Sequence, residues 1–270
     1  MTIEELKQKI KKDNPYFEYV DIKDYQVLDF LTFNEENANC KTCKCIAECK
    51  NSKRGFKPIL DNENNIAYVR CKYMQDELDL ALKSEKLNIM YMPPKKVKEA
   101  SLDGFRLDND KRLNCMNYIR KFISQIDNNE YSKGAYVQGD LGQGKTYLLS
   151  ALANELVERN HQVTLVYFPD LINDLKDDFD KLNKKINELK NTEILIIDDF
   201  GVGAMTSWVR DSIIAPILNY RMADLKPVFI SSNIKFKNLD TYLKVKEDID
   251  NIPAARIIRR IYELCTIIEM

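Results

Sequence analysis

The sequence predicts an α/β protein: a larger domain with a parallel sheet flanked by helices, preceded by a small helical, cysteine-rich domain. Three observations lead to this fold class. A glycine-rich loop joins an apolar strand to an apolar helix, and further buried strands alternate with helices after residue 100. Five of the seven cysteines lie before residue 72. We therefore expect two domains, residues 1–92 and residues 93–270.

Composition limits where the protein acts and what it binds. Lys and Arg number 41 and Asp and Glu 42, so the net charge is -1 and nucleic-acid binding would require a local basic patch. No apolar run is long enough to cross a bilayer, and the first residues, MTIEELKQKIKKDN, lack the apolar core of a signal peptide. We expect a cytoplasmic protein with no membrane partner, whose cysteines are reduced thiols or metal ligands.

The glycine-rich loop at residues 139–146 fits the pattern G-x-x-x-x-G-K-[ST]. Small residues let backbone N–H groups surround phosphates, and the helix that opens at Lys145 adds its positive end. Lys145 supplies a charge for the β and γ phosphates, and the Thr146 hydroxyl is a ligand for Mg²⁺. A glycine-rich turn without a ligand is the alternative. The residues expected to bind the nucleotide are Gly139, Asp140, Leu141, Gly142, Gln143, Gly144, Lys145, Thr146 and Tyr147.

Two later strands end in polar residues. The strand at residues 193–199, EILIIDD, ends in Asp198, expected to hold the Mg²⁺ water shell, and Asp199, placed to polarise the attacking water. The strand at residues 227–233 ends in Asn233, whose amide could orient that water. The alternatives are ordinary strand-end aspartates and an Asn favoured by a turn.

The last stretch, residues 252–270, contains AARIIRRIYELCTIIEM and is expected to include a short helix. It carries Arg256, Arg259 and Arg260. These arginines are either surface residues, or one of them reaches the γ-phosphate held by a neighbouring subunit.

The front domain has the thiols for a structural zinc site. Cys40 and Cys43 form a C-x-x-C pair, Cys49 follows, and Cys71 comes after a hairpin-like segment. Four thiolates satisfy tetrahedral Zn²⁺, and Cys45 could replace Cys49. Scattered reduced thiols or a redox pair are the alternatives. Residues 73–92 are expected to be helical, and Pro93-Pro94 then marks the domain boundary.

Several segments together resemble the AAA+ ATPases of the DnaC/DnaI class, the bacterial replicative helicase loaders: GDLGQGKTYLL, YFPDLINDLK, IDDFG, SWVRD and NYRM. The pattern C-x-x-C…C…GFKPIL…C is similar to their zinc-binding N-terminal domain, so the resemblance covers essentially the whole chain. It implies Walker A at Gly139, Gly144, Lys145 and Thr146, Walker B at Asp198 and Asp199, sensor 1 at Asn233, and an arginine finger at Arg256 or Arg260.

The resemblance also implies a function and partners. The front domain would bind the hexameric replicative helicase, and the ATPase domains would self-associate through ATP and load that helicase onto single-stranded DNA in primosome assembly. Asp199 stands where AAA+ proteins usually have Glu, so hydrolysis is expected to be slow. The candidates for contact with single-stranded DNA are Lys176, Trp208 and Arg210.

Three other functions fit part of the sequence. The ATPase subunit of a transposition system would have a DNA-targeting front domain in place of the cysteines. A small-molecule kinase would need an acceptor pocket and lid arginines near the nucleotide. A non-enzymatic zinc adaptor would carry an inactive ATPase domain.

Overall fold

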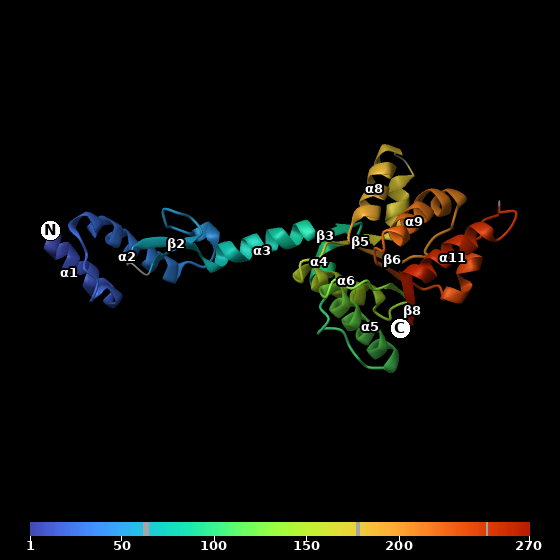
Figure 1. Ribbon diagram of the computed structural model, residues 1–270, viewed down its shortest axis with the longest axis horizontal. Coiled ribbons are helices and arrows are strands. Elements are labelled where there is room, and N and C mark those ends of the chain that lie inside the picture. Colours follow the sequence, from blue (N-terminus) through green and yellow to red (C-terminus); the bar gives the residue numbers. More distant parts are fainter. Residues whose placement is uncertain (62–64, 177–178, 247) are drawn as a thin grey trace. The chain divides into compact units, whose positions relative to one another are not determined.

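The computed structural model describes residues 1–270 apart from residues 62–64, 177–178 and 247 and the side chains of residues 80, 82–84 and 179–181. It divides into two compact units, Met1–Leu82 and Lys83–Met270. The division falls before the expected boundary at residue 93 because the strand β3 (Leu87–Met90) belongs to the sheet of the second unit (Figure 1).

The first unit packs short helices against a two-stranded sheet. Thr2 and Glu5 form a capping box that starts the first helix. Phe17 packs edge-to-face against Phe30 and Phe33, with ring centroids 4.9 and 5.1 Å apart, and this aromatic group is the centre of the unit's core. The elements are α1 (Ile3–Asp13), η1 (Pro15–Phe17), η2 (Asp24–Gln26), α2 (Val27–Thr42), η3 (Ile46–Glu48) and the antiparallel pair β1 (Phe56–Leu60) and β2 (Ile66–Arg70).

One expected helix is shorter than the sequence suggested. The helix α3 (Lys72–Lys86) ends before β3, whereas a single helix was expected over residues 73–92. Leu87–Met90 pair in parallel with Val163–Val166, and this pairing outweighs the local helical pattern. Tyr91 then adopts a φ of 61°, which turns the chain towards Pro93 and the short helix α4 (Pro94–Lys98).

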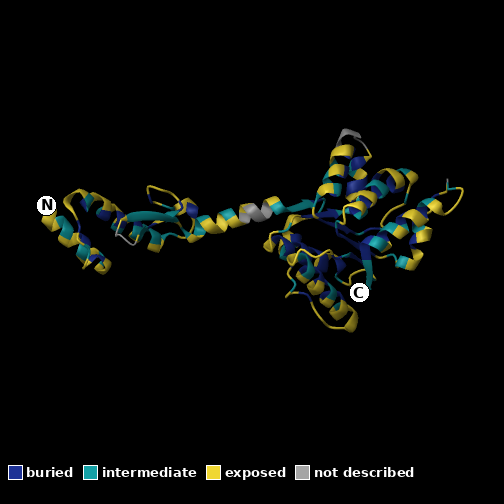
Figure 2. Ribbon diagram, viewed as in Figure 1, coloured by how far each residue is buried: buried dark blue, intermediate teal, exposed yellow. Residues whose placement is uncertain are grey.

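The second unit is an α/β fold built on a six-stranded sheet, as expected. The order is β3-β5-β6-β7-β4-β8, and every neighbouring pair is parallel. The central strands are buried on both faces (Figure 2). The remaining strands are β4 (Gly134–Gln138), β5 (Val163–Tyr167), β6 (Ile194–Asp198), β7 (Val228–Ser232) and β8 (Cys265–Glu269).

Helices cover both faces of this sheet, and most lie close to the expected positions. The last helix is short, as expected, and Cys265–Glu269 after it form β8 beside β4, a strand that the sequence did not predict. The helices are α5 (Asp110–Asp127), α6 (Lys145–Glu158), α7 (Phe168–Leu175), α8 (Phe179–Asn191), the π-helical η4 (Val209–Ile214), α9 (Ala215–Ala223), η5 (Phe236–Asn238), α10 (Leu239–Leu243) and α11 (Ile252–Leu264).

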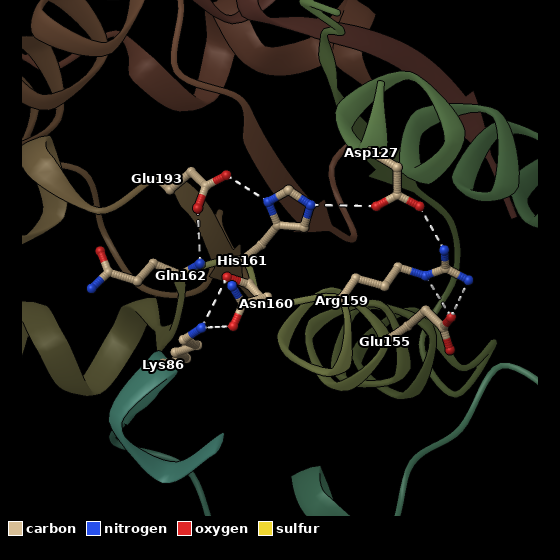
Figure 3. A network of polar contacts seen from close by, with 8 residues as sticks. All are labelled: Lys86, Asp127, Glu155, Arg159, Asn160, His161, Gln162 and Glu193. Atoms are coloured by element: carbon tan, nitrogen blue, oxygen red, sulfur yellow. Dashed lines mark hydrogen bonds and ion pairs between the residues drawn. The ribbon is translucent and has the colours of Figure 1, made fainter. Parts of the chain in front are cut away.

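A network of polar contacts lies at the edge of the sheet where β5 and β6 begin (Figure 3). The ring of His161 lies between Glu193, 2.6 Å from Nδ1, and Asp127, 3.4 Å from Nε2. Lys86, at the end of α3, contacts Asn160 in the same network. At the opposite edge of the sheet, where the strands end, the loops after β4, β6 and β7 meet and form the candidate site. No helix in the described part of the chain is long and apolar enough to span a membrane.

Candidate nucleotide-binding site

The loop between β4 and α6 has the backbone that phosphate binding requires. Gly142 and Gly144 have φ angles of 79° and 95°, a region that glycine enters without strain. A Cβ at Gly139 would lie 2.6 Å from the carbonyl oxygen of Met270, so this position is closed to larger residues by the residue that follows β8. The apolar face of α6 is buried in the core, which fixes the helix N-terminus beneath the loop.

Lys145 is buried within this loop, with 7% of its surface exposed. Its Nζ donates to the carbonyl oxygens of Gly139 at 2.8 Å and Asp140 at 2.9 Å, and to Oδ1 of Asn233 at 2.7 Å. Burial lowers the pKa of Lys145, and the nearby carboxylates, first Asp199, oppose this shift. The ammonium group thus donates to three oxygens in a pocket where phosphate oxygens could replace them.

Asp198 is a buried carboxylate whose partners are hydroxyl groups. It is 2% exposed and accepts from Thr146 Oγ1 at 3.0 and 3.1 Å and from Ser231 Oγ at 2.6 Å. Burial raises the pKa of Asp198, and hydrogen bonds from Ser231 and Thr146 oppose that effect. In the described residues no Lys, Arg or His pairs with it. A buried carboxylate beside a threonine hydroxyl, with no ion-pair partner among the described residues, fits Mg²⁺.

Asp199 lies next to this carboxylate in a strained backbone conformation, with φ of 59°. Its N–H donates to Ser231 Oγ at 2.8 Å, and its Oδ2 accepts from Tyr167 Oη at 3.3 Å. Its Oδ1 accepts a long hydrogen bond of 3.4 Å from Asn233 Nδ2. The side chain of Asn233 therefore connects Lys145 to Asp199.

These residues line a cavity of about 750 Å³. The sequence did not assign residues 91–93, the helix α4, Tyr167 with Asp170, or the serines Ser150 and Ser231, which also line the cavity. The first three lie at or after the carboxyl ends of strands β3 and β5, and that position is the signal which could have identified them. The expected residues that line the cavity are Leu141, Gly142, Gly144, Lys145, Thr146, Tyr147, Asp198, Asp199 and Asn233.

The expected arginines do not line this cavity. Arg256 is exposed on α11, and Arg259 pairs with Glu263. Arg260 is half-buried on the same helix, and its buried Nε has no hydrogen-bond partner in the part of the chain that is described.

One of the residues predicted to contact single-stranded DNA is wrong. Arg210 is only 1% exposed and forms a two-point ion pair with Asp248, so it is not available to DNA. Trp208 is partly buried and packs against the core, whereas Lys176 is exposed.

The cysteine region does not by itself show a zinc site, because no cluster of three or more metal-ligating side chains occurs among the described residues. Cys40, Cys43, Cys49 and Cys71 are half-buried, whereas Cys45 is exposed. Burial raises the pKa of Cys40, a hydrogen bond from Asn51 opposes this shift, and the charges of Cys49, Cys71 and Cys43 add to it. Asn51 Nδ2 lies 3.2 Å from Cys40 Sγ.

Comparison with known proteins places this site in a family. The chain is 29% identical to the replicative helicase loader DnaI of Bacillus subtilis, over 99% of this chain and 91% of that protein. A crystal structure of DnaI matches 69% of the chain and 95% of its own, at 35% identity and a TM-score of 0.62. A crystal structure of the DnaC helicase loader matches 65% of the chain and 99% of its own, at 26% identity and a TM-score of 0.53. These matches confirm the resemblance to helicase loaders. Residues 95–270 match the IstB-like ATP binding protein model, and the chain belongs to that family.

Proposed function

We propose that this protein is an ATP-dependent loader of a hexameric replicative helicase onto single-stranded DNA during primosome assembly. The observation that carries the proposal is the extent of the similarity to DnaI. It includes the front unit, which the IstB-like model, beginning at residue 95, does not cover. A transposition ATPase is supported by the family model alone, so the loader is favoured.

In this proposal the cavity beside the glycine-rich loop binds ATP. Lys145 transfers its hydrogen bonds from the carbonyls of Gly139 and Asp140 to the β and γ phosphates, and loop N–H groups surround them. Thr146 and Asp198 would hold Mg²⁺, which neutralises charge on the phosphate oxygens. The Lys145–Asn233 bond must also loosen, so nucleotide binding changes the contacts of Asn233.

Asp199 and Asn233 are the residues proposed for hydrolysis. Asp199 would accept the proton of the attacking water, and Asn233, already 3.4 Å from it, would orient that water. Tyr167 holds the opposite oxygen of Asp199. The side chain of Asp is one methylene shorter than that of Glu, so we propose slow hydrolysis and a role for ATP mainly in assembly.

Self-association would complete the site. Arg256 and Arg260 lie on α11, away from the cavity of their own chain, and a neighbouring subunit's ATP is the acceptor that we propose for one of them. The unpartnered Nε of Arg260 supports that residue, and the exposure of Arg256 supports the other. Single-stranded DNA would bind along the assembled subunits.

The front unit is proposed to bind the helicase and Zn²⁺. Cys40, Cys43, Cys49 and Cys71 are the proposed ligands, because they are half-buried while Cys45 is exposed. The bound metal would supply cross-links to a small unit with few core residues. Metal analysis of the purified protein should give one zinc per chain, and Cys40→Ser should remove it while Cys45→Ser should not. Equal zinc in both variants would contradict this ligand set.

A pull-down tests the partner. Full-length protein is mixed with the replicative helicase of the same cell, and variants of each unit are compared. Lys145→Ala should still bind the helicase, and Cys40→Ser/Cys43→Ser should not. Capture that depends on Lys145 but not on the cysteines would overturn the proposed division of roles, and no capture by wild type would refute the loader.

A further inference from the structure

The carboxyl end of β7 contains a buried serine that contacts both acidic residues of the site. Ser231 is 1% exposed. Its Oγ lies 2.6 Å from Oδ1 of Asp198 and 2.8 Å from the backbone nitrogen of Asp199. One hydroxyl group therefore joins the carboxylate proposed to face Mg²⁺ to the backbone of the proposed base.

The direction of these two hydrogen bonds is fixed by chemistry. The N–H of Asp199 can only donate, so Ser231 Oγ accepts from it. The single hydroxyl proton of Ser231 is then left for Asp198, whose carboxylate can only accept when ionised. The Thr146 hydroxyl also contacts Asp198, but it is the group proposed to bind the metal. Ser231 is thus the donor that stays with Asp198 when Mg²⁺–ATP is bound.

The sheet holds this serine rigidly. β7 lies between β6 and β4 in the sheet, and the carbonyl oxygen of Ser231 accepts from the N–H of Phe200 at 2.9 Å. The neighbouring Ser232 is also fully buried, but its hydroxyl contacts the backbone of Phe200 and Ile234 and neither acid. Ser232 is therefore a suitable control for Ser231, because both side chains are buried but only Ser231 contacts the two acidic residues.

We propose that Ser231 is a positioning residue for ATP hydrolysis. It directs one oxygen of Asp198 away from the metal position, so that the other faces Mg²⁺, and it holds the strained backbone of Asp199 at a φ of 59°. This inference rests on the proposed function, because it concerns the same ATP site.

The test measures ATP affinity by calorimetry, with Mg²⁺ and separately with EDTA, for the full-length protein. Mg²⁺ raises the affinity of the wild-type protein for ATP, and this increase should be roughly 10- to 100-fold smaller in Ser231→Ala, since a hydrogen bond to a charged group is removed. Its affinity in EDTA should be unchanged. Under saturating Mg²⁺–ATP, kcat should also fall, because Asp199 is no longer held.

Two comparisons separate positioning from stability. Ser232→Ala should keep the Mg²⁺-dependent gain. Ser231→Thr and Ser231→Val have the same shape, and only the Thr variant keeps the hydroxyl, so Thr should retain the gain and Val should lose it. This pair decides the question even if Ser231→Ala does not fold.

Three results would overturn the inference: an unchanged Mg²⁺-dependent gain in Ser231→Ala, an equal loss in EDTA, or equal behaviour of the Thr and Val variants. If wild-type protein binds no ATP in either buffer, the proposed function fails instead. The two failures are therefore distinguishable.

Discussion

Arg221 provides a prediction about stability that the sequence did not suggest. This arginine of α9 is 0% exposed, and burial lowers its pKa to about 9, so the guanidinium is charged at pH 7. Its two terminal nitrogens donate to backbone carbonyls at the end of α8 and the starts of β6 and β7, over distances of 2.7–3.3 Å. The acceptors are the carbonyl oxygens of Leu189, Lys190, Thr192, Glu193 and Pro227.

Replacing Arg221 by Met removes all five hydrogen bonds and leaves buried carbonyl oxygens without these donors. An unsatisfied buried polar group costs about 1–3 kcal/mol, and some of these carbonyls keep other partners, so we expect a loss of about 3–5 kcal/mol. That is a large part of the about 5–15 kcal/mol that stabilises a typical domain. Arg221→Lys keeps a charge but has fewer donors, and it should lose less.

Urea unfolding followed by tryptophan fluorescence measures this loss. Trp208 is the single tryptophan of the chain and lies in the same unit as Arg221, so its emission reports that unit. Arg159→Met is the control, because Arg159 is 43% exposed and pairs at the surface with Asp127 and Glu155 (Figure 3). It should change stability by less than about 1 kcal/mol. If Arg221→Met is as stable as this control, the account of the buried guanidinium is wrong.

Two further predictions concern backbone packing and pH. In Gly134→Ala the new Cβ would lie 1.8 Å from the carbonyl oxygen of Val228, so we expect the free energy of unfolding to fall by more than about 3 kcal/mol in the same urea experiment. In the control Gly203→Ala the space is open, and the loss should be about 1 kcal/mol. Equal losses would contradict this prediction. Hydrogen bonds from Arg210 lower the pKa of Asp248 to about 2, so its contribution to stability is complete above its ordinary value of 3.8 and is lost as the pH falls through about 2. The stability difference between wild type and Asp248→Asn, measured by urea unfolding, should therefore be larger at pH 7 than at pH 3, and a constant difference would refute the ion pair.

Local patterns predicted the part of the site that follows β4, β6 and β7. The spacing from Gly139 to Thr146 is a local requirement of a phosphate loop, and polar residues after apolar strands are visible without a structure. The carboxyl ends of parallel strands share one edge, so Asp198, Asp199 and Asn233 could be placed near the loop.

Pairings between distant segments were not predictable in the same way. The strand β3 forms because Leu87–Met90 find β5, and β8 forms because Cys265–Glu269 find β4. Both segments follow helices directly, without a local break in the pattern. Arg210 looked like a surface residue because its partner, Asp248, is 38 residues away.

The most direct test of the central claim is a helicase-loading assay with the full-length protein, the replicative helicase, ATP and a single-stranded DNA circle, in which helicase bound to the circle is measured. The wild-type protein should load the helicase with ATP and not without it. Lys145→Ala should bind helicase but fail to load it, because the charge proposed to hold the β and γ phosphates is gone. Loading by Lys145→Ala at the wild-type level would contradict the claim that ATP at this loop controls the reaction.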